Sequence, residues 1–166
     1  KPRKAILLGT SALVCLALSA PVMAEDFVIT SGTTTNDGEI IDGPADTVTV
    51  TGALTTTGTN LGIDTSGGTN TITVSETGRI TTVGDGADGI YNLGASNETT
   101  LSGSITTAGA GAFGIVNEGT TAQLAANSDV LNKTTVSGSI KTTGDGGIGI
   151  YNEGNTNTTT VSGRIE

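Results

Sequence analysis

The chain has 166 residues, of which 26 are Gly and 33 are Thr, whereas aromatic residues make up 2% and neither Trp nor His occurs. Few large side chains are available for a bulky core, and the many β-branched residues favour a thin β structure or disorder. The net charge of −9 gives the chain no electrostatic reason to bind nucleic acid, and the lack of His excludes His-based triads and His–metal sites.

The first 24 residues have the pattern of a cleavable secretion signal. Three basic residues lie in the first four positions, an apolar run follows over 5–18, and small residues lead to Ala24, after which acidic residues begin. The apolar run is short for a membrane-spanning helix. Cys15, which is the only cysteine, lies inside this run, so a chain cleaved after Ala24 has no disulfide. We expect residues 1–24 to be removed on export and residues 25–45 to form a lead-in or cap.

From about residue 46 onward the sequence repeats. A segment that reads aliphatic–hydroxyl–Gly–x–aliphatic recurs with its glycine 25 or 26 residues after the previous one, apart from one step of 35. The long step indicates an insertion of about ten residues near 120–131, which we expect to leave the repeat as a loop or short helix. A second marker, G-I-Y-N or G-I-V-N, follows the first. The glycines of the first marker are Gly52, Gly78, Gly103, Gly138 and Gly163.

A fixed period with glycine punctuation predicts a stacked architecture. We expect an all-β fold over 46–166, a single-stranded parallel β-helix (β-solenoid) with about 25 residues and three short strands per coil, and almost no helix. Equivalent side chains would then form columns, with the asparagines laddering at one turn. The expected columns are Val50, Val74, Leu101, Val136 and Val161; Leu54, Ile80, Ile105, Ile140 and Ile165; Ile63, Ile90, Ile115 and Ile150; and Asn92, Asn117 and Asn152.

Chemistry-bearing residues are sparse. The run G-D-G-A-D-G at 84–89 is similar to a calcium-binding solenoid turn and makes Asp85 and Asp88 weak metal candidates. The equivalent turns carry no acid and one acid, so ordinary turn chemistry is favoured. Together with Arg79, the same carboxylates are the candidates for a polysaccharide-cleaving site, which needs two acids in a cleft. We expect no cofactor, no metal and no catalytic residue, and we expect Asp88 and Lys141 to contribute little to stability.

Three asparagines invite a second interpretation. Asn97, Asn132 and Asn157 each begin an Asn-x-Thr triplet, which matches the pattern of an N-glycosylation site. Each also lies six residues before a repeat glycine, so we interpret the three as one structural column of turn residues.

An export signal followed by Thr/Gly/Asn-rich coils of the kind V-S-G-x-I…G-D-G-x-x-G-I-Y-N resembles the passenger region of autotransporters, over residues 1–166. Repetitive β-helices also occur in two-partner adhesins and phage tail proteins. The resemblance implies a right-handed parallel β-helix at the cell surface or outside the cell, with adhesion or self-association. It also implies two kinds of partner, the protein's own C-terminal outer-membrane β-barrel and surface glycans or proteins of host or neighbouring cells.

We therefore expect a structural or adhesive stalk and not an enzyme. Two alternatives remain open. One is a glycan-cleaving β-helix whose active groove lies beyond residue 166. The other is an ice-binding or surface-binding threonine array, which the run 47–51 and the Thr pairs at 81–82, 106–107 and 142–143 suggest. Because the chain stops within a repeat, we expect it to be the N-terminal piece of a longer protein.

Overall fold

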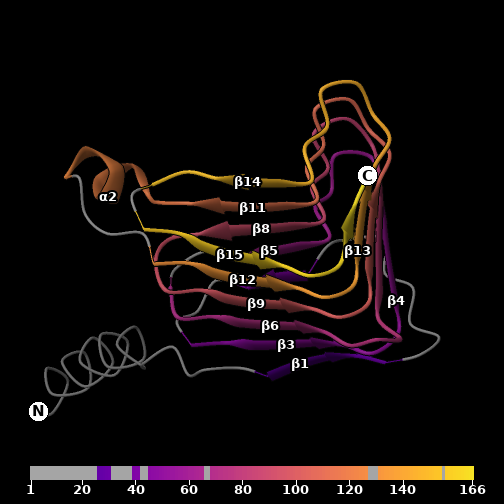
Figure 1. Cartoon of the computed structure of the whole chain (residues 1–166), viewed down its shortest axis with the longest axis horizontal. Helices are drawn as coiled ribbons and strands as arrows, with labels where there is room; N and C mark the ends of the chain where they lie inside the picture. Colours follow the sequence, from indigo (N-terminus) through magenta and orange to yellow (C-terminus); the bar gives the residue numbers. More distant parts are fainter. Residues whose placement is uncertain (1–25, 31–38, 42–44, 66–67, 127–130, 155) are drawn as a thin grey trace, which may run out of the picture.

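The structure, a computed structural model, describes residues 26–30, 39–41, 45–65, 68–126, 131–154 and 156–166. The expected signal over 1–24 lies outside the described residues. Within them the chain is nearly all-β, and every strand pair is parallel (Figure 1). The elements are β1 (Asp26–Ile29), β2 (Glu39–Ile41), β3 (Thr47–Val50), β4 (Ala53–Thr57), β5 (Ile63–Thr65), β6 (Thr71–Val74), β7 (Arg79–Val83), β8 (Ile90–Leu93), β9 (Glu98–Leu101), β10 (Ser104–Thr107), β11 (Ile115–Glu118), α2 (Thr121–Ala125), β12 (Lys133–Val136), β13 (Ser139–Thr142), β14 (Ile150–Asn152), β15 (Thr158–Val161) and β16 (Arg164–Ile165).

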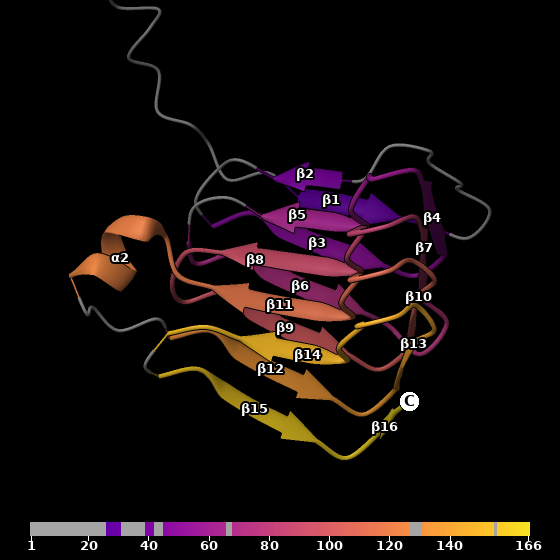
Figure 2. The ribbon, with the colours of Figure 1, turned by 90° about the horizontal axis from the view of Figure 1, so that it is seen from above.

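The strands form three parallel sheets, and consecutive strands go to different sheets. Sheet A has the order β1-β3-β6-β9-β12-β15, sheet B the order β14-β11-β8-β5-β2, and sheet C the order β16-β13-β10-β7-β4. From β3 onward the chain visits sheet A, then C, then B, and returns to sheet A one strand further along (Figures 1 and 2). This path is compatible with a β-solenoid.

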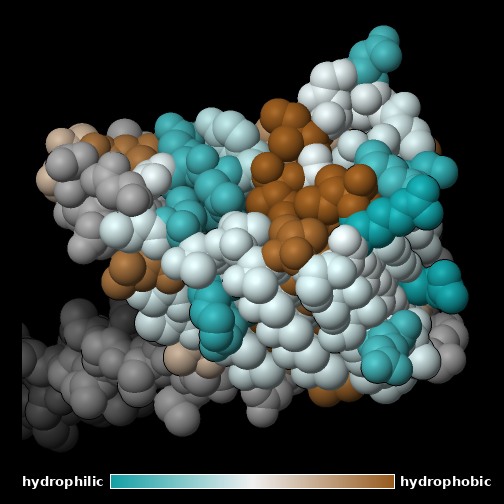
Figure 3. Space-filling model, viewed as in Figure 1, coloured by the Kyte–Doolittle hydropathy of each residue, from teal (hydrophilic) through white to brown (hydrophobic). Residues whose placement is uncertain are grey.

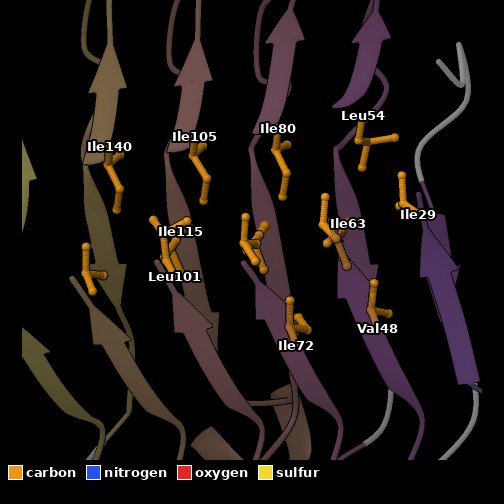
Figure 4. Close-up of a cluster of buried hydrophobic side chains, with 14 residues drawn as sticks. Ile29, Val48, Leu54, Ile63, Ile72, Ile80, Leu101, Ile105, Ile115 and Ile140 are labelled. Carbon is orange, nitrogen blue, oxygen red and sulfur yellow. The ribbon is translucent and has the colours of Figure 1, made fainter. Parts of the chain in front are cut away.

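Equivalent aliphatic residues pair in register from strand to strand. In sheet C, Ile80 pairs with Leu54 on one side and with Ile105 on the other. In sheet B, Ile115 pairs with Ile90 and Ile150. Because side chains alternate across a strand, one residue in two points inward, and the columns from the three sheets meet in one continuous core (Figure 4). The core comprises Ile29, Val48, Val50, Leu54, Ile63, Ile72, Val74, Ile80, Ile90, Leu101, Ile105, Ile115, Val136 and Ile140.

The repeat glycines are required because the backbone of the preceding repeat passes very close to them. A Cβ added at Gly103 would lie 2.1 Å from the carbonyl oxygen of Gly78, and one added at Gly138 would lie 2.0 Å from the carbonyl oxygen of Gly103. No side chain fits at that distance, so each repeat carries glycine at this corner. Gly111 has a different reason, since its φ of 67° lies in the left-handed region that favours glycine.

The core also contains a polar row. Asn92, Asn117 and Asn152 lie within the strands of sheet B and not at a turn as the sequence suggested, and Asn92 and Asn117 are almost completely buried. The Asn92 Nδ2 donates to Asn117 Oδ1 at 2.8 Å, and the Asn117 Nδ2 donates to Asn152 Oδ1 at 2.7 Å. Across the interior the same amides donate to the hydroxyls of Thr99, Thr134 and Thr159 in sheet A. The side-chain amides of this asparagine ladder therefore form hydrogen bonds both along the row and across the interior to sheet A.

The lead-in and the insertion both connect to this stack. In the lead-in, β1 pairs with β3 and β2 pairs with β5, so the range 25–45 contributes one strand each to sheets A and B. Near 120–131 the short helix α2 projects from the side of the sheets (Figure 2). It begins with a capping box between Thr120 and Gln123. Pairing then resumes in register, with Lys133 of β12 opposite Glu98 of β9.

Apolar side chains are exposed where the last strands lie. Ile148, Val161 and Ile165 are 41%, 44% and 43% exposed. Figure 3 shows a brown patch over this end of the stack, beside β14, β15 and β16. Val161 pairs with the buried Val136, and Ile165 pairs with the buried Ile140, so these two belong to core columns.

Candidate functional site

The two weak metal candidates lie in the turn after β7, and each binds a backbone amide of the equivalent turn 25 residues later. Asp85 Oδ1 accepts a hydrogen bond from the Ala110 N–H at 2.9 Å, and Asp88 Oδ1 accepts one from the Phe113 N–H at 2.7 Å. Both carboxylates thus connect one repeat to the next. No group of three or more metal-ligating side chains occurs in the described part of the chain.

The burial of Asp88 differs from what the sequence predicts. The residue is only 9% exposed, although it lies in a turn. Burial raises the pKa of its carboxyl above the usual range, and the hydrogen bond from Phe113 partly offsets that rise. Asp88 is therefore a structural bridge between turns and not a free surface acid. Lys141, in contrast, is exposed on β13, as expected.

Two of the three asparagines of the glycosylation pattern are buried. Asn97 and Asn132 are each 1% exposed. Each uses its side-chain oxygen to accept a backbone N–H of the repeat before it, Asn97 from Asn70 at 3.0 Å and Asn132 from Asn97 at 2.9 Å. Attachment of a glycan to Asn97 or Asn132 would require the fold to open, so the interpretation as a structural column holds for these two.

Threonines cover the outer face of sheet A. Thr49, Thr73, Thr100, Thr135 and Thr160 pair in register across five strands, and each alternates with inward residues. The Thr pairs at 81–82 and 106–107 lie on β7 and β10 of sheet C. They add fewer hydroxyls to the surface than the sequence suggests, because the second residue of each pair points into the core and is 0% exposed. Half of those hydroxyls are therefore absent from the surface.

Aromatic and acidic side chains gather on the outer face of sheet B. Asp64, Tyr91, Val116 and Tyr151 occupy equivalent outward positions on β5, β8, β11 and β14. The ring of Phe113, from the turn before β11, stacks on Tyr151 with a centroid distance of 5.6 Å and an interplanar angle of 25°. We call the residues Asp64, Tyr91, Phe113, Val116, Glu118, Tyr151 and Glu153 the sheet B face.

Two glutamates complete the sheet B face. Glu118 ends β11, and its Oε2 accepts the Tyr91 hydroxyl at 2.6 Å. Glu153 follows β14, where its backbone N–H continues the pairing by donating to the Asn117 carbonyl at 2.8 Å, which brings it beside Glu118. The sequence contains the needed signal, since Tyr91, Val116 and Tyr151 directly follow the inward isoleucines of one column, but the repeat by itself predicts only core and turn residues there.

Nearby carboxylates raise the pKa of both tyrosines of the sheet B face. Burial and the carboxylates of Glu118, Asp64 and Asp88 raise the pKa of Tyr91 far above its usual value. The carboxylate of Glu153, slight burial and the carboxylate of Glu118 raise the pKa of Tyr151. Burial alone raises the pKa of Asp64. Negative charge on this face is therefore concentrated around two tyrosine rings.

The positive charges of the described residues lie elsewhere. Arg79, Lys141 and Arg164 are on sheet C. Lys133 is on sheet A, where its Nζ lies 2.7 Å from Glu98 Oε1. Arg164 forms an ion pair with Glu166. Within the described ranges, no carboxylate of the sheet B face has a Lys or Arg partner.

Comparison with family models, with curated protein sequences and with solved structures finds no match. Among the described residues, no helix combines the length and the apolar character needed to cross a membrane.

Proposed function

We propose that the chain is a single-stranded parallel β-helix with about 25 residues per coil and that it serves as a surface-displayed or secreted structural or adhesive stalk. The observation that carries the proposal is the register: from β3 onward, side chains in all three sheets pair with their counterparts one repeat away, 24–27 residues apart or 35 apart across the insertion. Such repetition makes an elongated rod, whose continuous outer faces suit adhesion.

The proposal extends to export. In this proposal, residues 1–24 are a cleavable signal, and the chain is an autotransporter passenger. A C-terminal outer-membrane β-barrel of the same protein then brings the stalk to the cell surface. What supports an adhesive role over an enzymatic one is the use of the polar groups. Asp85 and Asp88 bind backbone N–H groups of the next repeat, and the buried Asn92 and Asn117 bind each other. Surface glycans or proteins of other cells are the partners that this role requires.

Accessibility on intact cells tests the stalk. The complete gene would be expressed in a Gram-negative host, and an antibody against residues 25–166 would be applied before and after permeabilisation, with a periplasmic protein as control. We expect labelling of intact cells that do not label for the control, and a mature N-terminus at Glu25. Retention of the chain in the cytoplasm with residues 1–24 attached would contradict the proposal.

The outward threonine column of sheet A favours a second candidate function, binding to ice or to another ordered surface. Its hydroxyls repeat at the spacing of parallel strands, about 4.8 Å, and on the same face the charges of Glu98 and Lys133 offset each other in an ion pair. Inhibition of ice recrystallisation by residues 25–166 would support this function. The matched test is Thr100→Val, which keeps the shape and removes one hydroxyl; equal inhibition by both proteins would rule out a role for that hydroxyl.

A further inference from the structure

The sheet B face carries three carboxylates that have no Lys or Arg partner among the described residues. Its strands contribute Asp64, Glu118 and, just after β14, Glu153, whereas all four described basic residues lie on sheets A and C. Two of those four are already in ion pairs with Glu98 and Glu166. A cationic partner therefore meets no repulsion on this face and displaces no existing ion pair.

The aromatic groups of the same face supply a second kind of attraction for cations. The stacked rings of Phe113 and Tyr151 form a platform beside the two glutamates, and Tyr151 is 36% exposed. Ring faces attract ammonium and guanidinium groups. Carboxylates take up guanidinium groups through paired hydrogen bonds. Rings and carboxylates together thus fit the long cationic side chains of Lys and Arg better than they fit a metal ion, which uses no ring.

The face is also held rigid. Tyr91 is fixed by its hydrogen bond to Glu118, and Val116 between the two tyrosines is only 2% exposed. Asn92 and Asn117, which alternate with these outward residues, are locked in the buried amide ladder. Binding on such a surface loses little side-chain entropy on the side of this chain.

We propose that the sheet B face docks a basic peptide segment of a partner protein, with Arg or Lys side chains placed beside Glu118 and Glu153 and over the rings of Phe113 and Tyr151. The inference rests on the proposed adhesive role and gives that role a face and a partner chemistry. An extended segment suits the site because the face is a row of side chains that crosses successive strands.

The test measures binding of fluorescent hexa-arginine to residues 25–166, with hexa-glutamine as the neutral reference, by fluorescence anisotropy. The site variant is E118Q/E153Q. The matched control is E76Q/E98Q, which makes the same change in net charge in the turn after β6 and on sheet A. We expect hexa-arginine to bind the site variant about tenfold more weakly, which corresponds to about 1.4 kcal/mol, and the control less than about twofold more weakly.

Equal weakening in the site variant and the control would overturn the proposal, because it would show attraction by net charge alone. Binding of hexa-glutamine as tight as that of hexa-arginine would overturn it as well. Glutamine keeps the size of glutamate and an oxygen for the Tyr91 hydroxyl, so the fold should persist, which circular dichroism checks. A second variant, Y151L, should weaken hexa-arginine binding several-fold at unchanged net charge. Failure of these tests leaves the accessibility of the stalk on cells unaffected, so the two proposals are distinguishable.

Discussion

Asn117 is held by three side-chain hydrogen bonds within the stack. It accepts from Asn92 and donates to both Asn152 and Thr134, and it is 1% exposed. Asn117→Ala would remove one hydrogen bond each from the buried side chains of Asn92 and Thr134, so we expect a loss of about 1–3 kcal/mol in the free energy of unfolding. Urea titration followed by circular dichroism measures it. Asn152→Ala, at an exposed position of the same row, should cost less, and equal costs would contradict a buried ladder.

Asp88 contributes to the fold through one charge-assisted hydrogen bond. Asp88→Ala removes the acceptor of the Phe113 N–H, and we expect it to destabilise the chain by about 1–2 kcal/mol. Lys141→Ala, on an exposed side chain, should stay within about 0.5 kcal/mol. Asp88→Asn keeps an oxygen acceptor and removes the buried charge, so it should recover most of the loss. If Asp88→Ala and Lys141→Ala have the same midpoint of urea unfolding, the bridge between the turns is not stabilising.

Asp64 makes stability depend on pH. Burial raises the pKa of its carboxyl above 3.8 in the folded chain, so the folded state binds more protons than the unfolded state between 3.8 and the raised value. Stability therefore falls as the pH rises through that window. Asp64→Asn removes this dependence, and we expect the variant to gain stability relative to the parent between low and neutral pH. Urea titrations from pH 3 to pH 8 measure the difference; a difference that stays constant would contradict the burial effect.

At the scale of the element, the sequence predicts register well because glycine and the aliphatic columns share one period. Gly103 and Gly138 cannot carry a Cβ because the backbone of the preceding repeat lies too close to them. This requirement places a glycine at the same position of every repeat, where the sequence shows it. The pairing of Ile90, Ile115 and Ile150 follows from the same alignment. Thus strand positions and core columns can be predicted without a structure.

Threonine and the turns are less predictable for a physical reason. Thr tolerates both faces of a strand, so the sequence does not indicate that Thr82 is buried whereas Thr81 points outward. There Thr82 donates its hydroxyl to the Ala87 carbonyl at 2.6 Å, a bond that only the folded turn creates. The burial of Asp88 and the meeting of Tyr91 with Glu118 likewise depend on how turns stack, which is a property of neighbouring repeats.

The insertion between β11 and β12 is a separable element. Asn117 and Asn132 are 15 residues apart, whereas Asn92 and Asn97 are 5 apart, so deletion of Thr121–Val130 restores the short connection. Because α2 carries its own capping box and β12 pairs in register after it, we expect the deletion to change stability by less than about 0.5 kcal/mol. Urea unfolding measures this, and a loss of several kcal/mol would show that the insertion packs as a lid.

At the scale of the whole molecule, the three sheets differ in what they present outward while sharing one core. Sheet A presents threonines, sheet B presents rings and carboxylates, and sheet C carries Arg79, Lys141 and Arg164. Inward side chains are constrained by packing against the neighbouring repeats, whereas outward ones are not. The faces can therefore diverge in charge and chemistry without any change in the stack, which suits the adhesive role proposed above.

The shared core makes one further prediction, that unfolding of the stack is cooperative. Ile115 lies between Ile90 and Ile150 in its column and is 0% exposed. Ile115→Ala leaves a cavity in the middle of the core and should cost about 2–5 kcal/mol. Circular dichroism reports on all strands, and the fluorescence of Tyr91 and Tyr151, the only tyrosines, reports on sheet B. Both signals should shift together to lower urea concentration in the variant, because a two-state stack has one transition. Separate transitions would show that neighbouring repeats unfold independently.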